Sequence, residues 1–140
     1  MVFIRDDGIF DAPIDKIWKL LGDMSGTHHH ESITEMVPVD TKGNVTTFNV
    51  KTKRPDGKTY TEVWRMTMFA PDGFLSETLE GPAKGSKNTH TYIPMGNKTK
   101  VVVTGDFRLE GMDDETTRKM TLDYLNNVFN EDNKHIQTVK

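Results

Sequence analysis

One short segment of the sequence combines hydrogen bonding with acid–base chemistry. Asn88, His90 and Tyr92 alternate within 86–94, so in a strand their side chains would share one face. A histidine titrates near neutral pH, so His90 could act as an acid or a base, with Tyr92 as a donor beside it. If this face is concave, it supplies the polar part of a pocket. If it is convex, these are ordinary solvated residues, and the sequence leaves both alternatives open.

Glu62 is a second candidate because it alternates with two aromatic residues, Tyr60 and Trp64. Inside an apolar cavity the pKa of its carboxyl group would rise, which suits a proton shuttle or a polar anchor for a ligand. With the opposite assignment of strand faces, Glu62 is simply exposed. Arg65 lies on the face opposite Glu62. Either it or Arg108 could pair with a ligand carboxylate, although such residues more often form cross-strand ion pairs.

The run His28-His29-His30-Glu31 contains the ligand types that zinc and other divalent ions prefer. Adjacent residues cannot all point at one ion in a helix or a strand. A site would therefore need at most two of them, with ligands from elsewhere such as His90 or His135. We expect no metal site and no cofactor, and we interpret the run as a loop or helix end that places His30 at the mouth of a pocket.

Composition narrows the classes of function. The 140 residues carry a net charge of -3 and include no cysteine. The charge disfavours a nucleic-acid binder, and the lack of cysteine excludes disulfides, thiolate catalysis and zinc–cysteine sites. No apolar run approaches the ~18 residues of a membrane span, and acids follow the first residues where a signal peptide would be basic. We expect a cytoplasmic monomer or homodimer, without the motifs of nucleotide binding or of nucleophilic serine catalysis.

Turn chemistry divides the middle of the chain into strands. Glycine stands beside Asn, Asp or Pro at intervals of ~10–16 residues, and these residues allow tight hairpins. The segments between them are rich in Val, Thr, Phe, Tyr and Trp, which predicts an up-and-down antiparallel sheet. Together with a strand near the N-terminus, the expected strands are 2–10, 32–40, 45–54, 58–70, 73–80, 86–95 and 99–110.

Helical signals flank these strands. Asp11 can cap a short helix that Gly22 ends, and 23–30 could form a second. From Met112 to about Val139 there is neither Gly nor Pro, and apolar residues recur at helical spacing, which predicts a long helix. Only a long sheet could cover its apolar stripe. We therefore expect one α+β domain over 1–140 with a helix-grip fold, in which about seven curved strands hold a C-terminal helix.

The segment Phe10-Asp11-Ala12-Pro13-Ile14-Asp15-Lys16-Ile17-Trp18, followed by this order of elements, resembles the START/Bet v 1-like (SRPBCC) superfamily. Within it, the polyketide cyclase/dehydrase and lipid-transport group is most similar. That group typically opens with an aliphatic strand, a D/N-A-P turn and a helix with an aliphatic–Trp pair, here Ile17-Trp18. The resemblance implies a cavity between the concave sheet and the long helix. Its members include carriers, aromatase/cyclases and co-chaperones, so it implies a fold more closely than a function.

From these features we expect a binding module for a lipid, a polyketide or another hydrophobic or aromatic small molecule, with the long helix as a lid. Two other functions stay open. One is a cyclase/dehydratase-type enzyme that uses His90, Tyr92 and Glu62, and the other is a co-chaperone-like interaction module. The residues expected to contact the ligand are Trp18, His30, Tyr60, Glu62, Trp64, Met66, Asn88, His90, Tyr92, Phe107, Tyr124 and Val128.

Overall fold

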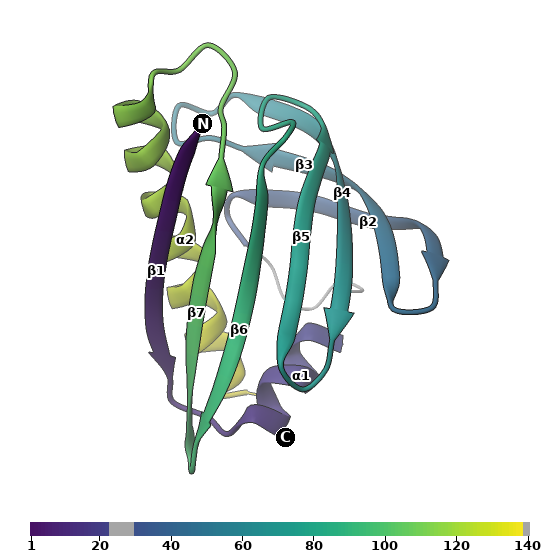
Figure 1. Cartoon of the computed structure of the whole chain (residues 1–140), viewed down its shortest axis with the longest axis vertical. Helices are drawn as coiled ribbons and strands as arrows, with labels where there is room; N and C mark the ends of the chain where they lie inside the picture. Colours follow the sequence, from purple (N-terminus) through teal and green to yellow (C-terminus); the bar gives the residue numbers. More distant parts are fainter. Residues whose placement is uncertain (23–29, 139–140) are drawn as a thin grey trace.

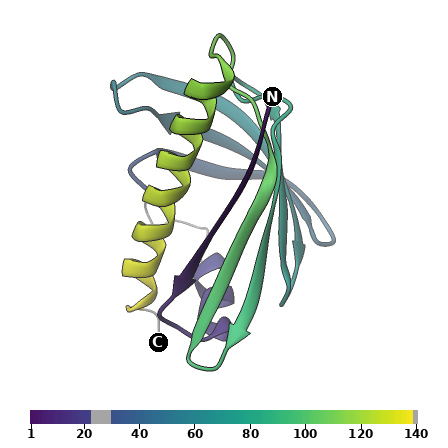
Figure 2. The same cartoon turned by 60° about the vertical axis from the view of Figure 1, so that its left-hand side comes forward.

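A seven-stranded antiparallel sheet curves around one long helix in the computed structural model, which describes residues 1–22 and 30–138 (Figure 1). The strand order is β1-β7-β6-β5-β4-β3-β2, so strands that follow one another from β2 to β7 are neighbours, and β1 pairs with β7. The helix α2 crosses the open side of the sheet (Figure 2). The elements are β1 (Val2–Phe10), α1 (Ile14–Gly22), β2 (Ile33–Lys42), β3 (Val45–Lys53), β4 (Thr59–Phe69), β5 (Gly73–Glu80), β6 (Lys87–Met95), β7 (Lys98–Phe107) and α2 (Asp114–Ile136).

The predicted strands and the long helix are confirmed, with small shifts at their ends. The long helix begins after Asp113, whose side chain accepts a hydrogen bond from the Thr116 backbone N–H at 2.7 Å and so caps it. Of the two short helices expected after the first strand, the described residues contain only α1. The second was expected in 23–30, of which residues 23–29 lie outside the part that the structure describes.

Close packing holds α2 over one side of the sheet. In the described part of the chain it packs against β1, β7 and α1 but not against β2–β6. The ring of Phe129 lies against the backbone of Gly8, where a Cβ atom would be only 2.8 Å from it, and its centroid is 4.7 Å from that of Phe10. A side chain at position 8 would therefore force the Phe129 ring to shift from its place between β1 and α2. The strands beyond β7 are therefore not packed directly against α2, and the short helix α1 packs against β6 and β7.

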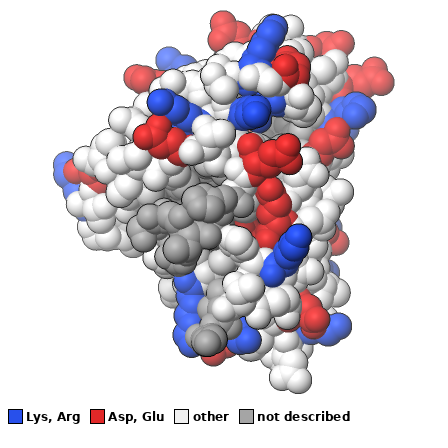
Figure 3. Space-filling view, turned by 180° about the vertical axis from the view of Figure 1, so that it is seen from behind, with Lys and Arg blue, Asp and Glu red and all other residues white. Residues whose placement is uncertain are grey.

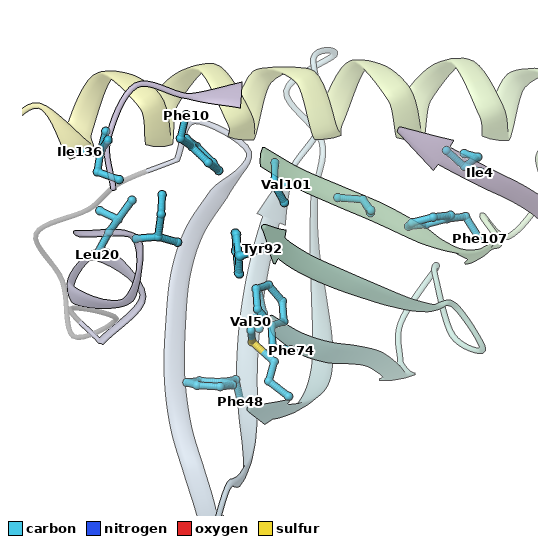
Figure 4. Close-up of a cluster of buried hydrophobic side chains, with 14 of the residues drawn as sticks. Ile4, Phe10, Leu20, Phe48, Val50, Phe74, Tyr92, Val101, Phe107 and Ile136 are labelled. Carbon is cyan, nitrogen blue, oxygen red and sulfur yellow. The ribbon is translucent and has the colours of Figure 1, made fainter. Parts of the chain in front are cut away.

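Alternation along each strand decides which side chains face the helix. On β4, Glu62 and Met66 are buried while Thr61 and Arg65 are exposed, so the even-numbered residues lie on the concave face. The same pattern on neighbouring strands turns apolar residues inward. Figure 4 shows some of them pointing from the sheet into the space beneath α2, namely Phe74, Tyr92 and Val101.

Candidate functional site: a cavity beneath the long helix

The concave face of the sheet and one side of α2 enclose a cavity of about 970 Å³. Exposed residues of the β3–β4 turn and of α2, such as Asp56 and Asn127, also line it, so it opens to the surface there. Most of the wall is apolar or aromatic, which is the usual composition of a small-molecule pocket. These side chains include Phe10, Met36, Trp64, Met66, Phe74, Val101, Val103, Phe107, Met120, Leu125, Val128 and Phe129.

Glu62 is buried in this wall, with only 7% of its surface exposed. The Trp64 Nε1–H donates to one carboxyl oxygen at 3.2 Å, and the Ala83 backbone N–H donates to the other at 3.2 Å. Gly81, at φ 106°, makes room for this carboxyl group, because a Cβ atom there would be 2.7 Å from Glu62 Cγ. Burial raises the pKa of Glu62, and the two hydrogen bonds and the charge of Arg54 only partly offset this.

The face of β6 that carries Asn88, His90 and Tyr92 is turned inward, and all three residues line the cavity. Asn88 Oδ1 is buried without a hydrogen-bond partner among the described residues. The imidazole of His90 stacks on the ring of Phe74, with their centroids 4.3 Å apart, and burial lowers the pKa of His90 to about 4. His90 is therefore a neutral hydrogen-bonding group at physiological pH.

Tyrosines face the cavity from both the sheet and the helix. Tyr124 of α2 lines it opposite the sheet, and burial, followed by the negative charge of Glu62 and of Asp132, raises the pKa of its phenol. Burial, followed by the charge of Asp132, also raises the pKa of Tyr92. Both phenols stay protonated at neutral pH and are able to donate a hydrogen bond.

His30 ties the start of β2 to the helix at the edge of the cavity. Its Nδ1 lies 3.0 Å from Glu131 Oε1 and its Nε2 lies 3.2 Å from Asp132 Oδ1, while the Glu31 backbone N–H donates to Glu131 Oε2 at 2.9 Å. Burial alone would lower the pKa of His30, but the hydrogen bonds and charges of Asp132 and Glu131 outweigh it and raise the pKa above 6.5. We refer to His30, Glu131 and Asp132 as the histidine clasp.

All of the residues expected to contact a ligand line the cavity except Trp18 and Tyr60. The Trp18 indole N–H donates to the Pro71 carbonyl at 2.8 Å. The Trp18 ring packs edge-to-face with that of Tyr92, with their centroids 5.9 Å apart, so Trp18 supports the cavity from behind. Tyr60 lies under the guanidinium of Arg54, which is 4.2 Å from its ring centroid.

Sequence reasoning missed several lining residues. Ser76 pairs across strands with Asn88, so the alternation of β5 combined with the correct register would have found it. Asp132 carried no signal, because a carboxylate near the end of a helix is usually a solvated residue. Its position here depends on where α2 lies relative to His30.

The remaining sequence candidates have other surroundings. Arg65 forms a two-fold hydrogen bond with Glu77, at 3.1 and 3.0 Å, across the outer face of the sheet. Arg108 is exposed at the cavity edge, beyond the end of β7. In the described part of the chain, no three histidine or carboxylate side chains gather in a way that would hold a metal ion. His28 and His29 lie outside the described residues.

A curved sheet around a long helix, with a cavity between them, defines a helix-grip protein. The family model described as polyketide cyclase / dehydrase and lipid transport matches residues 4–131, and this chain belongs to that family. The expected membership of the START/Bet v 1-like superfamily is thus confirmed. No match was found among curated proteins. Neither helix of the described residues is long and apolar enough to cross a membrane.

Three solved structures illustrate the fold. A START superfamily protein from Mycobacterium smegmatis has a TM-score of 0.85 at 10% identity, covering 99% of both chains. TTHA0849 from Thermus thermophilus has a TM-score of 0.84 at 16% identity, covering 97% of both chains. The Zhui aromatase/cyclase from Streptomyces sp. R1128 has a TM-score of 0.75 at 15% identity, covering 96% of this chain and 90% of that one. At these identities the likeness concerns the fold.

Proposed function

We propose that the protein binds a small hydrophobic molecule, such as a lipid, a polyketide or an aromatic compound, in the cavity between the sheet and α2. The observation that carries this proposal is the cavity of about 970 Å³ with a mainly apolar wall. A volume of this size lies at the upper end of the range of small-molecule sites. Several charged side chains of the lining, such as Lys53, Asp56 and Asp123, are exposed, whereas Asn88, His90 and Tyr92 are neutral and would orient a ligand rather than exclude an apolar one.

A fluorescent probe tests this proposal. N-phenyl-1-naphthylamine is uncharged and becomes brighter in an apolar environment, so it should give a saturable rise in fluorescence with the folded protein. Ser76→Phe places a ring in the cavity, because Ser76 lies on the concave face beside Asn88. It should weaken probe binding by roughly tenfold or more, since the new side chain competes for the same volume.

The matched control is Thr91→Phe, which adds the same ring to an exposed position of β6. This variant should bind the probe as the unmodified protein does, and both variants should retain their circular dichroism. Unchanged binding in Ser76→Phe, or no saturable binding by the folded protein, would rule out the cavity as the site.

A second candidate function is a cyclase/dehydratase-type reaction. The observation in its favour is that Glu62, His90 and Tyr92 all line the same cavity. Loss of water from a β-hydroxy ketone needs a base for the proton next to the carbonyl and a donor for the departing hydroxide. Because burial raises the pKa of Glu62 and keeps Tyr92 protonated, Glu62 is the better base and Tyr92 the donor, whereas His90, with a pKa of about 4, is a weak base.

This reaction can be followed with 4-hydroxy-4-phenylbutan-2-one, whose dehydration gives a conjugated enone that absorbs in the ultraviolet. The enzyme hypothesis predicts that the protein dehydrates this compound faster than the background rate. It also predicts that Glu62→Gln loses this turnover while it still binds N-phenyl-1-naphthylamine. Probe binding without turnover would leave the protein as a carrier.

A further inference from the structure

Glu62 is a buried carboxyl group without an ion-pair partner among the described residues. Its two hydrogen bonds come from neutral donors, Trp64 Nε1 and the Ala83 backbone N–H. The guanidinium of Arg54, whose charge acts on Glu62, lies over the ring of Tyr60 and donates to its hydroxyl oxygen at 3.4 Å. A carboxylate has about four acceptor positions, so roughly two remain after these bonds.

An isolated buried carboxylate is costly, because burial removes hydration that only a cation or several donors can replace. Proteins rarely maintain such a group unless something pairs with it. The surrounding backbone accommodates the Glu62 carboxyl group, because Gly81 leaves space for it and the Ala83 N–H donates a hydrogen bond to it. A positively charged partner that enters through the cavity would supply what the surrounding residues do not.

The walls near Glu62 suit a cation as well. Trp64 donates a hydrogen bond to Glu62, and Tyr124 is close enough to be affected by its charge. Both line the cavity, and aromatic faces attract ammonium groups through their quadrupoles. Among the other polar side chains of the lining, His90, with a pKa of about 4, is neutral and therefore does not repel a cation. The lysine and arginine residues of the lining are Lys53 at the end of β3, Arg54 in the turn after it and Arg108 after β7. The side chains of Lys53 and Arg108 are exposed.

Carboxylates also outnumber lysine and arginine among the lining residues, and acidic side chains gather on the face shown in Figure 3. Some of these acids have exposed cationic partners. Lys51 pairs with Glu35 at 3.2 Å and Lys119 pairs with Asp123 at 3.0 Å. The excess of carboxylates at the rim of the cavity would attract cations from solution. Inside the cavity, Glu62 is the carboxyl group that could bind one.

We propose that the ligand is a hydrophobic amine, whose ammonium group donates to Glu62 while its apolar part lies against the aromatic wall. This inference rests on the proposed binding function and names the ligand class for the same cavity. It predicts that the site discriminates between ligands of the same shape by their charge. Fatty acids and other carboxylates would bind poorly, because they would place a second negative charge beside Glu62.

Three probes with the same ring system test the charge preference by isothermal titration calorimetry at neutral pH. They are 1-naphthylmethylamine, which is a cation, 1-naphthylmethanol, which is neutral, and 1-naphthylacetate, which is an anion. The amine should bind roughly tenfold to a hundredfold more tightly than the alcohol, which is the range expected for hydrogen bonds to a charged group. In Glu62→Gln the affinity for the amine should fall to that of the alcohol, while the alcohol binds as before.

The titrations distinguish a failure of the proposed binding function from a failure of the amine inference. If none of the probes binds, the proposed binding function fails, and the amine inference fails with it. If the alcohol or the anion binds as tightly as the amine, the amine inference is overturned and the binding function stands. If Glu62→Gln keeps the preference for the amine, Glu62 is not the recognition group. Unchanged binding of the alcohol shows that the variant has kept its cavity.

Arg54→Gln should change the affinity for the amine in the opposite direction to Glu62→Gln. Arg54 is the cation whose charge acts on Glu62, so its removal should strengthen binding of 1-naphthylmethylamine by several-fold and leave 1-naphthylmethanol unaffected. Equal changes for both probes would indicate a change in the shape of the cavity rather than in its charge, and would count against the inference.

Discussion

The histidine clasp should make stability depend on pH, and His30→Gln tests this. The His30 side chain is 9% exposed, and its partners Glu131 and Asp132 are 29% and 17% exposed. Glutamine can hydrogen bond but cannot carry the positive charge that both carboxylates approach. Removal of the imidazolium leaves two neighbouring carboxylates on α2 without that charge.

The magnitude follows from the two contacts. A hydrogen bond to a charged group contributes about 1.5–3 kcal/mol, and the contact to Glu131 belongs at the low end because Glu131 is the more exposed partner. Water and the glutamine side chain would recover part of each contribution. The expected loss in the free energy of unfolding is therefore about 2–4 kcal/mol at a pH where His30 is charged. For a domain of this size that corresponds to a fall in Tm of roughly 7–14 °C.

The direction of the pH dependence is fixed by the raised pKa. Because the pKa of folded His30 lies above its ordinary value of 6.5, folding favours the protonated form. The stabilisation is therefore fully present below about pH 6.5 and is lost as the pH rises through the folded pKa. The difference in Tm between the unmodified protein and His30→Gln should be largest in mildly acidic buffer and should shrink in alkaline buffer.

Thermal unfolding followed by circular dichroism measures this difference across a pH series. Asp132→Asn, alone and combined with His30→Gln, should show strong non-additivity, since both changes break the same contact. Lys119→Gln is the control, because it breaks an exposed ion pair on the same helix and should cost about 0.5 kcal/mol or less. A Tm offset that does not vary with pH, or one as small as that of the control, would refute the role assigned to the clasp.

Two further substitutions probe the close contacts of the fold. Gly81→Ala should lower the free energy of unfolding in urea by about 2 kcal/mol more than Gly96→Ala does. Both glycines have positive φ, but only at position 81 would a Cβ atom press against Glu62, so equal losses of stability would contradict this explanation. Phe129→Ala should cost about 2–4 kcal/mol and accelerate amide exchange in the C-terminal half of α2, because its ring fills the space above Gly8; exchange that is unchanged there would show that the helix is held by other contacts.

The order of strands and helices was predictable because its signals are local. Alternation, glycine-containing turns and the long segment without Gly or Pro each depend on near neighbours in the chain, so the sequence determined seven strands and the long helix to within a few residues. The motif through Trp18 indicated the family correctly, since it reports the same local turn and helix. The chemistry of the candidate residues was also visible, in that Glu62, His90 and Tyr92 stood out beside aromatic neighbours.

Only the tertiary structure decided which of these side chains share a cavity. Both faces of β4 carry apolar residues, so the burial of Glu62 depended on the direction in which the sheet curves around α2. Tyr60 lies on the same strand face as Glu62 yet does not line the cavity, and the sequence carries no mark of where the cavity ends. His30 and Glu131 are separated by 101 residues, and their contact depends on the position of α2, which Phe129 packs against β1. Chemical identity is a property of each residue, whereas the pairing and burial that give it a function are set by distant parts of the chain.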